Sequence, residues 1–265
     1  MELSLILGVL VGVVLGLTGA GGGILAVPAL IVGMGWSMQM AAPVALVAVA
    51  ASAAIGAIEG FRKRLVRYKA ALVMAIGGIP FTSAGVSAAH LLPQQWLLGL
   101  FSLLLLIVAA RLIRQARASE LEIEPHRIFA EVDLQTGRFH WTWGTARLFL
   151  AIGAVTGFMT GLLGVGGGFV IVPALRRFTN VTLHGIVATS LMVIALVGTG
   201  GVISAVMHGA ELPLQLTGLF ALATIAGMLL GRKLIAHLSQ KHVQISFAGM
   251  LIVVAVRLIA KASLL

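Results

Sequence analysis

The sequence has no cysteine, one tyrosine and only eight acidic residues among its 265 positions. Without cysteine the chain can form no disulfide, no thiolate metal site and no cysteine nucleophile. Charged residues make up 10% of the chain, against about 25% in soluble globular proteins, while 60% of the residues are hydrophobic. So few charges cannot cover a soluble domain, and this excludes a soluble enzyme, a disordered regulator and a secreted disulfide scaffold.

Long apolar runs occupy most of the chain. A membrane-spanning helix needs about 20 predominantly apolar residues. Uncharged stretches of this kind cover residues 3–34, 40–58, 70–92, 94–110, 148–175, 185–207, 212–231 and 243–256. The predicted fold class is therefore an all-α polytopic membrane protein.

A polar segment from Arg111 to Arg147 separates the fourth apolar run from the fifth and holds five of the eight acidic residues. Within it, residues 128–134 and 138–143 alternate apolar and polar side chains around a Gln-Thr-Gly turn, which is typical of a β-hairpin. We therefore expect a first transmembrane repeat at 1–113, a cytoplasmic linker with a small β-hairpin at 114–146, and a second transmembrane repeat at 147–265.

The two halves share a pattern of glycine and proline. Adding 145 to eight such positions between Gly8 and Pro28 gives glycine or proline again, between Gly153 and Pro173. Internal self-similarity of this kind is typical of transporters built from two repeats. Three of the glycines in each half are four residues apart, a spacing that favours close packing of one helix on another.

Basic and neutral loops alternate in opposite order in the two halves, so equivalent loops are expected on opposite sides of the membrane. If the first segment of each half enters and returns on its own side, all but two of the 18 Lys and Arg residues lie in the cytoplasm. Eight simple crossings would leave five outside. Because Lys and Arg are enriched in cytoplasmic loops, the first arrangement is favoured. It predicts inverted-topology repeats with both termini outside the cytoplasm.

A glycine-rich sequence interrupts the first apolar segment of each half, at Gly16–Gly23 and at Gly161–Gly168. Each glycine costs a helix about 1 kcal/mol relative to alanine, so we expect the helices to open there and to resume at Ile24 and Phe169. A resumed helix presents free N–H groups and the positive end of its dipole, which suit an anion. Two such breaks face to face would bind a small anion near the midplane, without a metal or another cofactor.

Polar residues inside the apolar segments are few. The Thr189–Ser190 pair is replaced by Val44–Ala45 in the first half, and Glu59 is expected to form an ion pair beside Lys63. No paired carboxylates and no nucleophile with a base can be assembled, so no enzymatic activity is expected. Short basic clusters between apolar runs do not form a nucleic-acid surface. The residues expected to bind the substrate are Thr18, Gly19, Gly21, Gly22, Gly23, Gly164, Gly166, Gly167, Gly168, Thr189 and Ser190.

These motifs resemble the sulfite exporter TauE/SafE family of bacterial membrane proteins. The resemblance rests on Gly16–Gly23 followed by Pro28, on Gly161–Gly168 followed by Pro173, and on the Ala-Thr-Ser-Leu sequence at 188–191. It covers nearly the whole chain apart from the linker at about 115–145. It implies a multi-pass permease of the bacterial inner membrane for small sulfur oxyanions or organosulfonates, which under the charge pattern above has both termini in the periplasm.

Two classes of function remain open. The first is a transporter that moves a small anion by alternating access around the glycine breaks. The alternative is a non-transporting membrane scaffold or accessory subunit, in which the glycines only pack helices and the linker docks a partner. The expected partners are a small anion and the lipid bilayer. The sequence leaves open which anion is moved, the direction, the coupling ion, channel against carrier, and whether the chain forms a homo-oligomer.

Overall fold

The structure is a computed structural model that describes residues 2–117, 129–130, 139–234 and 238–263. Seven of the helices in this part of the chain, α3 to α6 and α8 to α10, are long and apolar enough to cross a membrane, as the sequence predicts. The elements are α1 (Glu2–Thr18), the 3-10 helix η1 (Gly19–Leu25), α2 (Ala26–Met34), α3 (Met38–Arg62), α4 (Tyr68–Leu91), α5 (Gln94–Arg117), α6 (Trp143–Leu163), α7 (Gly168–Phe178), α8 (Leu183–Met207), α9 (Leu214–Leu234) and α10 (Gln240–Ser263).

The structure does not support the expected β-hairpin. Most of the expected hairpin falls on residues 131–138, which lie outside the described residues. The described residues on either side, Ala130 and Phe139, belong to no strand. Ala130 instead forms an isolated parallel bridge with Thr179, which follows α7. The linker thus pairs with the end of α7, a contact between distant parts of the sequence that local alternation cannot indicate.

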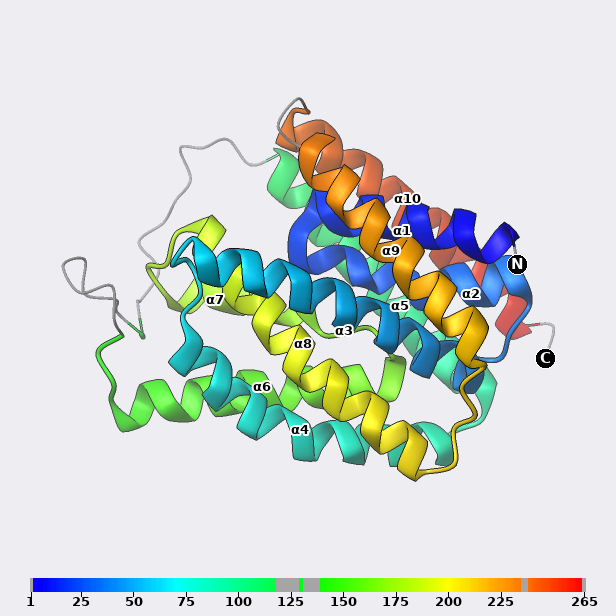
Figure 1. The fold of residues 1–265 in the computed structure, drawn as a ribbon, viewed down its shortest axis with the longest axis horizontal. Helices are drawn as coiled ribbons and strands as arrows, with labels where there is room; N and C mark the ends of the chain where they lie inside the picture. Colours follow the sequence, from blue (N-terminus) through cyan, green and yellow to red (C-terminus); the bar gives the residue numbers. More distant parts are fainter. Residues whose placement is uncertain (1, 118–128, 131–138, 235–237, 264–265) are drawn as a thin grey trace.

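The first apolar segment of each half reverses direction. In Figure 1, α1 runs from the right, where the N-terminus lies, toward the left, and α2 returns to the right. Consistent with this reversal, a Cβ added to Gly33 near the end of α2 would lie 2.5 Å from Leu7 Cδ1 near the start of α1. The second half has the opposite sense in the same view, since α6 runs from left to right and α7 returns to the left.

Basic residues gather at one end of the bundle. The C-terminal ends of α3, α5, α7 and α9 and the N-terminal end of α6 all lie toward the left of Figure 1, and all carry arginine or lysine. The opposite end holds both termini, where Lys261 Nζ donates to the carbonyl oxygens of Ile31 and Trp36 at 3.2 and 3.5 Å. The ends of the bundle therefore differ strongly in charge.

Glycine allows two pairs of helices to pack backbone against backbone. On α6, a Cβ added to Gly153, Gly157 or Gly161 would lie 2.0 Å from the carbonyl oxygen of Met74, Gly78 or Thr82 of α4, respectively. Any larger side chain would force the two helices apart, because a Cβ essentially never approaches an oxygen so closely. This confirms the packing role that the spacing of these glycines predicts.

The same contact recurs between α1 and α9. Added Cβ atoms on Gly8, Gly12 and Gly16 would lie 2.9, 2.1 and 2.3 Å from the carbonyl oxygens of residues 220, 224 and 228. Adding 145 to the three glycines of α1 gives the three glycines of α6. Adding 146 to the three carbonyl residues of α4 gives the three carbonyl residues of α9. The first helix of each half thus packs against the other half, so that the two halves interlock.

Candidate functional site

The break between α6 and α7 depends on three glycines in left-handed conformations. Gly164, Gly166 and Gly167 have φ values of 73°, 71° and 69°, which L-residues with side chains rarely adopt. Gly164 ends α6, with its N–H bonded to Thr160 O at 2.8 Å, and Gly167 is the N-cap of α7. The helix therefore opens at the second glycine-rich sequence, and it resumes at Gly168, one residue before the expected position.

The opened segment leaves amides without acceptors. In the described part of the chain, the N–H groups of Gly166, Gly167 and Gly168 donate to no backbone or side-chain acceptor, whereas Val170 N and Ile171 N both donate to Gly167 O. All three glycines are buried. A buried N–H group without a partner is rare and costs about 1–3 kcal/mol, so a run of them calls for an acceptor from outside the chain.

The first break has a different structure. Gly19–Leu25 forms a 3-10 helix, in which backbone N–H groups bond to carbonyls three residues earlier, and Ala26 N donates to Gly23 O in this way. Only Gly19, with φ of 71°, is left-handed. The sequence therefore predicts an interruption within Gly16–Gly23 but not its form, because the segment is a tightened helix that continues into α2 at Ala26, two residues after the expected Ile24.

The two breaks meet at Val49 of α3. An added Cβ on Gly23 would lie 2.9 Å from Val49 Cγ1 and 3.4 Å from Val165 O, and one on Gly166 would lie 2.9 Å from the same Val49 atom. A Cβ on Gly166 would also lie 3.0 Å from Ile194 Cγ2 of α8. The glycine-rich segments of the two halves are thus neighbours in a buried region between α3 and α8.

The hydroxyl groups singled out in the sequence have partners within the protein. Thr18 donates to Val14 O at 2.8 Å, and Ser190 donates to Ile186 O at 2.7 Å. Thr189 accepts from the backbone N–H of Arg67, at the N-cap of α4, at 3.0 Å. Thr18 and Ser190 thus use their hydroxyl hydrogens within their own helices, whereas Thr189 uses its oxygen as an acceptor and donates no hydrogen bond in the described part of the chain.

Thr156 is a candidate that the sequence reasoning missed. Its side chain is fully buried on α6, its Oγ1 has no hydrogen-bond partner, and an added Cβ on Gly167 would lie 2.2 Å from its Cγ2. Ser52 of α3 is likewise fully buried with an unpartnered hydroxyl. The available signal was the Thr156–Thr160 pair, one helical turn apart and directly before the break.

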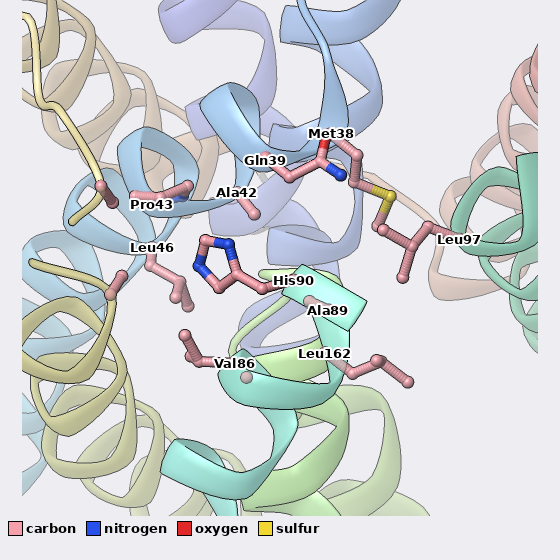
Figure 2. Close-up of a pocket in the computed structure, with 13 residues that line it drawn as sticks. Met38, Gln39, Ala42, Pro43, Leu46, Val86, Ala89, His90, Leu97 and Leu162 are labelled. Atoms are coloured by element: carbon pink, nitrogen blue, oxygen red, sulfur yellow. The ribbon is translucent and has the colours of Figure 1, made fainter. Parts of the chain in front are cut away.

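A narrow cavity lies beside the end of α6, toward the end of the bundle that holds the termini. It has a volume of about 30 Å³ and lies between the starts of α3 and α5 and the ends of α4, α6 and α8. Gly161 and Leu162 lie at its wall, just before the break. Figure 2 shows the imidazole of His90 among the lining side chains, close to Ala42 and Leu46. The volume suffices for a water molecule or two but not for a larger solute.

A polar cluster borders this cavity. His208, the C-cap of α8, stacks on His90 of α4, with ring centroids 6.2 Å apart. Its Nε2 lies 3.0 Å from Ser87 Oγ, and Ser204 Oγ donates to Ser83 Oγ at 3.2 Å. These contacts link the C-terminal ends of α4 and α8.

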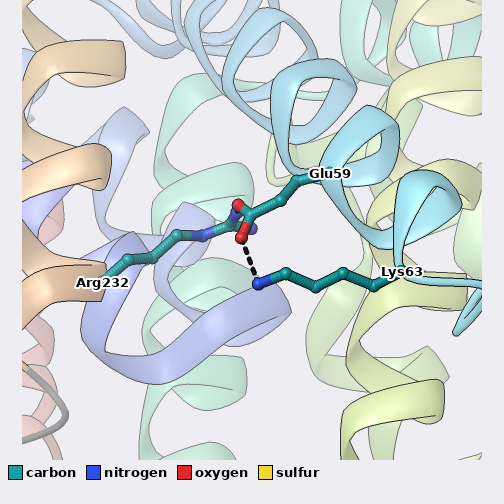
Figure 3. A network of polar contacts seen from close by, with 3 residues as sticks. All are labelled: Glu59, Lys63 and Arg232. Atoms are coloured by element: carbon teal, nitrogen blue, oxygen red, sulfur yellow. Dashed lines mark hydrogen bonds and ion pairs between the residues drawn. The ribbon is translucent and has the colours of Figure 1, made fainter.

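An ionic cluster links helices at the opposite end of the bundle. Glu59 near the end of α3 accepts a hydrogen bond from Lys63 at 2.6 Å and another from Arg232 of α9. Figure 3 shows the two cations reaching the carboxylate from opposite sides. The sequence predicts the Lys63 contact, because residues four apart share a helix face, but Arg232 comes from the other half of the chain.

Comparison with known proteins agrees with this architecture. A family described as "Sulfite exporter TauE/SafE" matches residues 4–258, which include both breaks and every helix that packs around them. The chain belongs to this family. No solved structure matches the chain significantly.

The TauE/SafE relatives come from distant organisms. A "Probable membrane transporter protein" of Xylella fastidiosa is 34% identical over 198 residues, which cover 74% of this chain and 69% of the relative. YjnA of Bacillus subtilis is 28% identical over 98% of this chain and its own full length, and MJ0441 of Methanocaldococcus jannaschii is 27% identical over 95% and 92%. Both are named probable membrane transporter proteins as well.

Proposed function

We propose that this TauE/SafE protein transports a small anion, either sulfite or an organosulfonate, across the bacterial inner membrane. The anion binds at the glycine breaks, between α3 and α8. The family description names sulfite, and relatives that align with the full chain carry transporter names. The chemistry of the second break supports an anion independently of these names.

The buried amides of Gly166–Gly168 carry this proposal. They lie at the positive end of the α7 dipole and have no acceptor within the described chain. Backbone N–H groups at a helix N-terminus form an anion site that needs no cation. An oxyanion would give these amides the acceptors that they lack, and no neutral or cationic solute would do so as well.

The proposed site has a core and a surround. Gly166, Gly167 and Gly168 hold the anion. Gly21–Gly23 belong to the first break, where Gly23 lies beside Val49 and Val165. Gly19 and Gly164 shape the two turns, and Thr18, Thr189 and Ser190 line the surrounding helices. In this scheme the first break contributes mainly when its 3-10 helix opens, as transport around a fixed site requires.

We further propose that the halves are inverted repeats that work by alternating access. Three observations support this: the interlocking glycine contacts recur at a nearly constant offset, α1 and α6 run in opposite senses, and polar clusters link helices at both ends. With the arginine-rich end in the cytoplasm, the two termini lie in the periplasm. The narrow cavity then lies toward the periplasm.

The test is flux of labelled sulfite and organosulfonates into proteoliposomes. Gly21 lies in the first break. A Cβ added there has no atom within 4 Å, and the backbone of Gly21 is not left-handed. Gly21→Leu therefore adds a bulky side chain at the break without a backbone clash. We expect at least about a tenfold loss of flux, while the control Gly99→Leu, also in open space on α5, keeps wild-type flux.

Equal flux in Gly21→Leu and wild type would place the pathway elsewhere. No flux of any anion in the wild-type protein, together with a stable partner captured through residues 115–145, would instead favour the scaffold or accessory-subunit function.

A further inference from the structure

Three buried hydroxyl groups in the described part of the chain lack a hydrogen-bond partner: those of Ser52, Thr156 and Thr217. Ser52 and Thr156 have no exposed surface at all. An unpaired buried hydroxyl is unfavourable, because it gives up water without gaining a protein partner. Such groups call for a particular explanation wherever they gather.

Most other buried hydroxyls of the bundle behave differently. They donate to the carbonyl four residues earlier in their own helix, which is the usual solution within an apolar segment. Examples are Thr82, Ser102, Thr160, Ser190 and Thr224, with oxygen–oxygen distances of 2.7 to 2.9 Å. Ser52 and Thr156 are exceptions to a solution that their own helices make available.

Thr156 contacts the second glycine break, and Ser52 shares a face of α3 with the residue at which the two breaks meet. Thr156 packs against Gly167, whose amide has no acceptor. Ser52 follows Val49 by three residues and precedes Gly56 by four, so it shares their face of α3, and Val49 is the residue at which the two breaks meet. One unpaired hydroxyl thus belongs to a side chain whose methyl group contacts the break, and the other lies one helical turn from Val49.

We propose that Thr156 and Ser52 donate hydrogen bonds to the anion held at the N-terminus of α7, and that the site takes oxyanions without an ammonium group. This inference rests on the proposed transport function and specifies its substrate class. Amides and hydroxyls together form a set of donors that surrounds an oxyanion and bears no net charge of its own.

The exclusion of ammonium groups follows from where the carboxylates lie. Within the described residues the acids are Glu2, Glu59 and Glu211. Glu2 and Glu211 are exposed near the bundle end that holds the termini, and Glu59 is paired with Lys63 and Arg232 at the other end. An ammonium group in the buried site would lose its water and meet no carboxylate, which is strongly unfavourable.

The test compares two probes of similar size. Isethionate carries a hydroxyl where taurine carries an ammonium group, and both bear the same sulfonate. In binding assays on purified wild-type protein, we expect sulfite and isethionate to bind and taurine to bind at least about tenfold more weakly, because an unpaired ammonium is penalised.

Isosteric variants test the hydroxyls. Thr156→Val and Ser52→Ala should each weaken sulfite binding about tenfold, and the double variant further, since each loses a hydrogen bond to a charged group. Thr217→Val is the matched control, because it removes an equally unpartnered buried hydroxyl from α9 and should leave binding unchanged. The melting temperature without ligand should stay equal or rise in both site variants, because an unsatisfied hydroxyl is replaced by an apolar group.

The outcomes separate this inference from the proposed function. Sulfite binding equal to wild type in Thr156→Val and Ser52→Ala, or taurine binding as tight as isethionate, overturns the inference while transport of anions stands. Absence of both binding and flux for every anion overturns the proposed function and this inference with it. A lower melting temperature without ligand in the site variants would show that the hydroxyls serve the fold.

Discussion

Arg232 of α9 crosses over Gly56 of α3, close enough that an added Cβ would collide with its guanidinium, and donates a hydrogen bond to Glu59. The corresponding positions of the other half, 145 residues on from Glu59 and Lys63, are Ser204 and His208. These two also cross-link helix ends, at the other end of the bundle. Positions 145 residues apart thus link helix ends at the two ends of the bundle with different chemistry, ionic at one and hydroxyl–imidazole at the other.

The Glu59–Arg232 pair should stabilise the contact between α3 and α9. We expect Glu59→Gln and Arg232→Gln each to destabilise the protein by about 1 kcal/mol, with a coupling of similar size in the double-mutant cycle. The Arg232 side chain is about one quarter exposed and the Glu59 side chain less than half, so screening by salt should be partial. Thermal unfolding in detergent at low and high salt measures both effects.

Lys63→Gln is the control for this cycle. The Lys63 side chain is 62% exposed, so its pair with Glu59 should contribute less than the Arg232 pair. A coupling energy near zero between Glu59 and Arg232 would mean that the ionic contact does not hold α3 against α9.

The backbone contact between α6 and α4 should tolerate no added methyl group. A Cβ at Gly157 would lie 2.0 Å from Gly78 O, so Gly157→Ala should cost about 1–3 kcal/mol through forced separation of the helices. Gly12→Ala should cost a similar amount on α1, where the distance to Thr224 O is 2.1 Å. Gly218→Ala, with open space around it, should be neutral or stabilising. Melting temperatures of the three variants test this directly.

How far the sequence predicts this fold depends on the range of the interactions. Glycine content and spacing are local signals, so the positions of both breaks and the small-residue faces of α1 and α6 could be predicted. The helices that receive those faces could not, because α1 pairs with α9 and α6 with α4 across more than 50 residues. The expected hairpin is not supported in the described residues, and the pairing that the structure does show, between Ala130 and Thr179, joins distant parts of the sequence.

The candidate site was predictable as a place but not atom by atom. Glycine runs indicate where a helix is weak, but whether it opens or tightens depends on neighbours, and the first break tightens into a 3-10 helix. Likewise the sequence cannot tell a hydroxyl that bonds its own helix from one that stays unpaired. It therefore favoured Thr189 and Ser190 over Thr156, whose unpaired state appears only once packing is known.

Thr189 should matter for stability more than for the substrate. Its hydroxyl accepts the N–H of Arg67 at the start of α4, so Thr189→Val should leave that amide unpaired and cost about 1–2 kcal/mol. We expect sulfite affinity to change less than twofold. Ser190→Ala, which removes only a bond within α8, is the matched control for stability. A large loss of sulfite affinity in Thr189→Val with an unchanged melting temperature would mean that this hydroxyl binds the substrate.

The orientation in the membrane can be read with single cysteines, because the natural chain contains none and gives no background labelling. Lysine and arginine concentrate in cytoplasmic loops, so the end of the bundle that bears Arg64 and Arg177 should face the cytoplasm. Both residues are exposed, as are Gln95 and Glu211 at the other end. In intact cells, a membrane-impermeant maleimide should label Gln95→Cys and Glu211→Cys at once, and Arg64→Cys and Arg177→Cys only after permeabilisation. Because Arg64 belongs to the first half and Arg177 to the second, a split result between these two would contradict inverted repeats, whereas a full reversal would contradict only the placement of the termini.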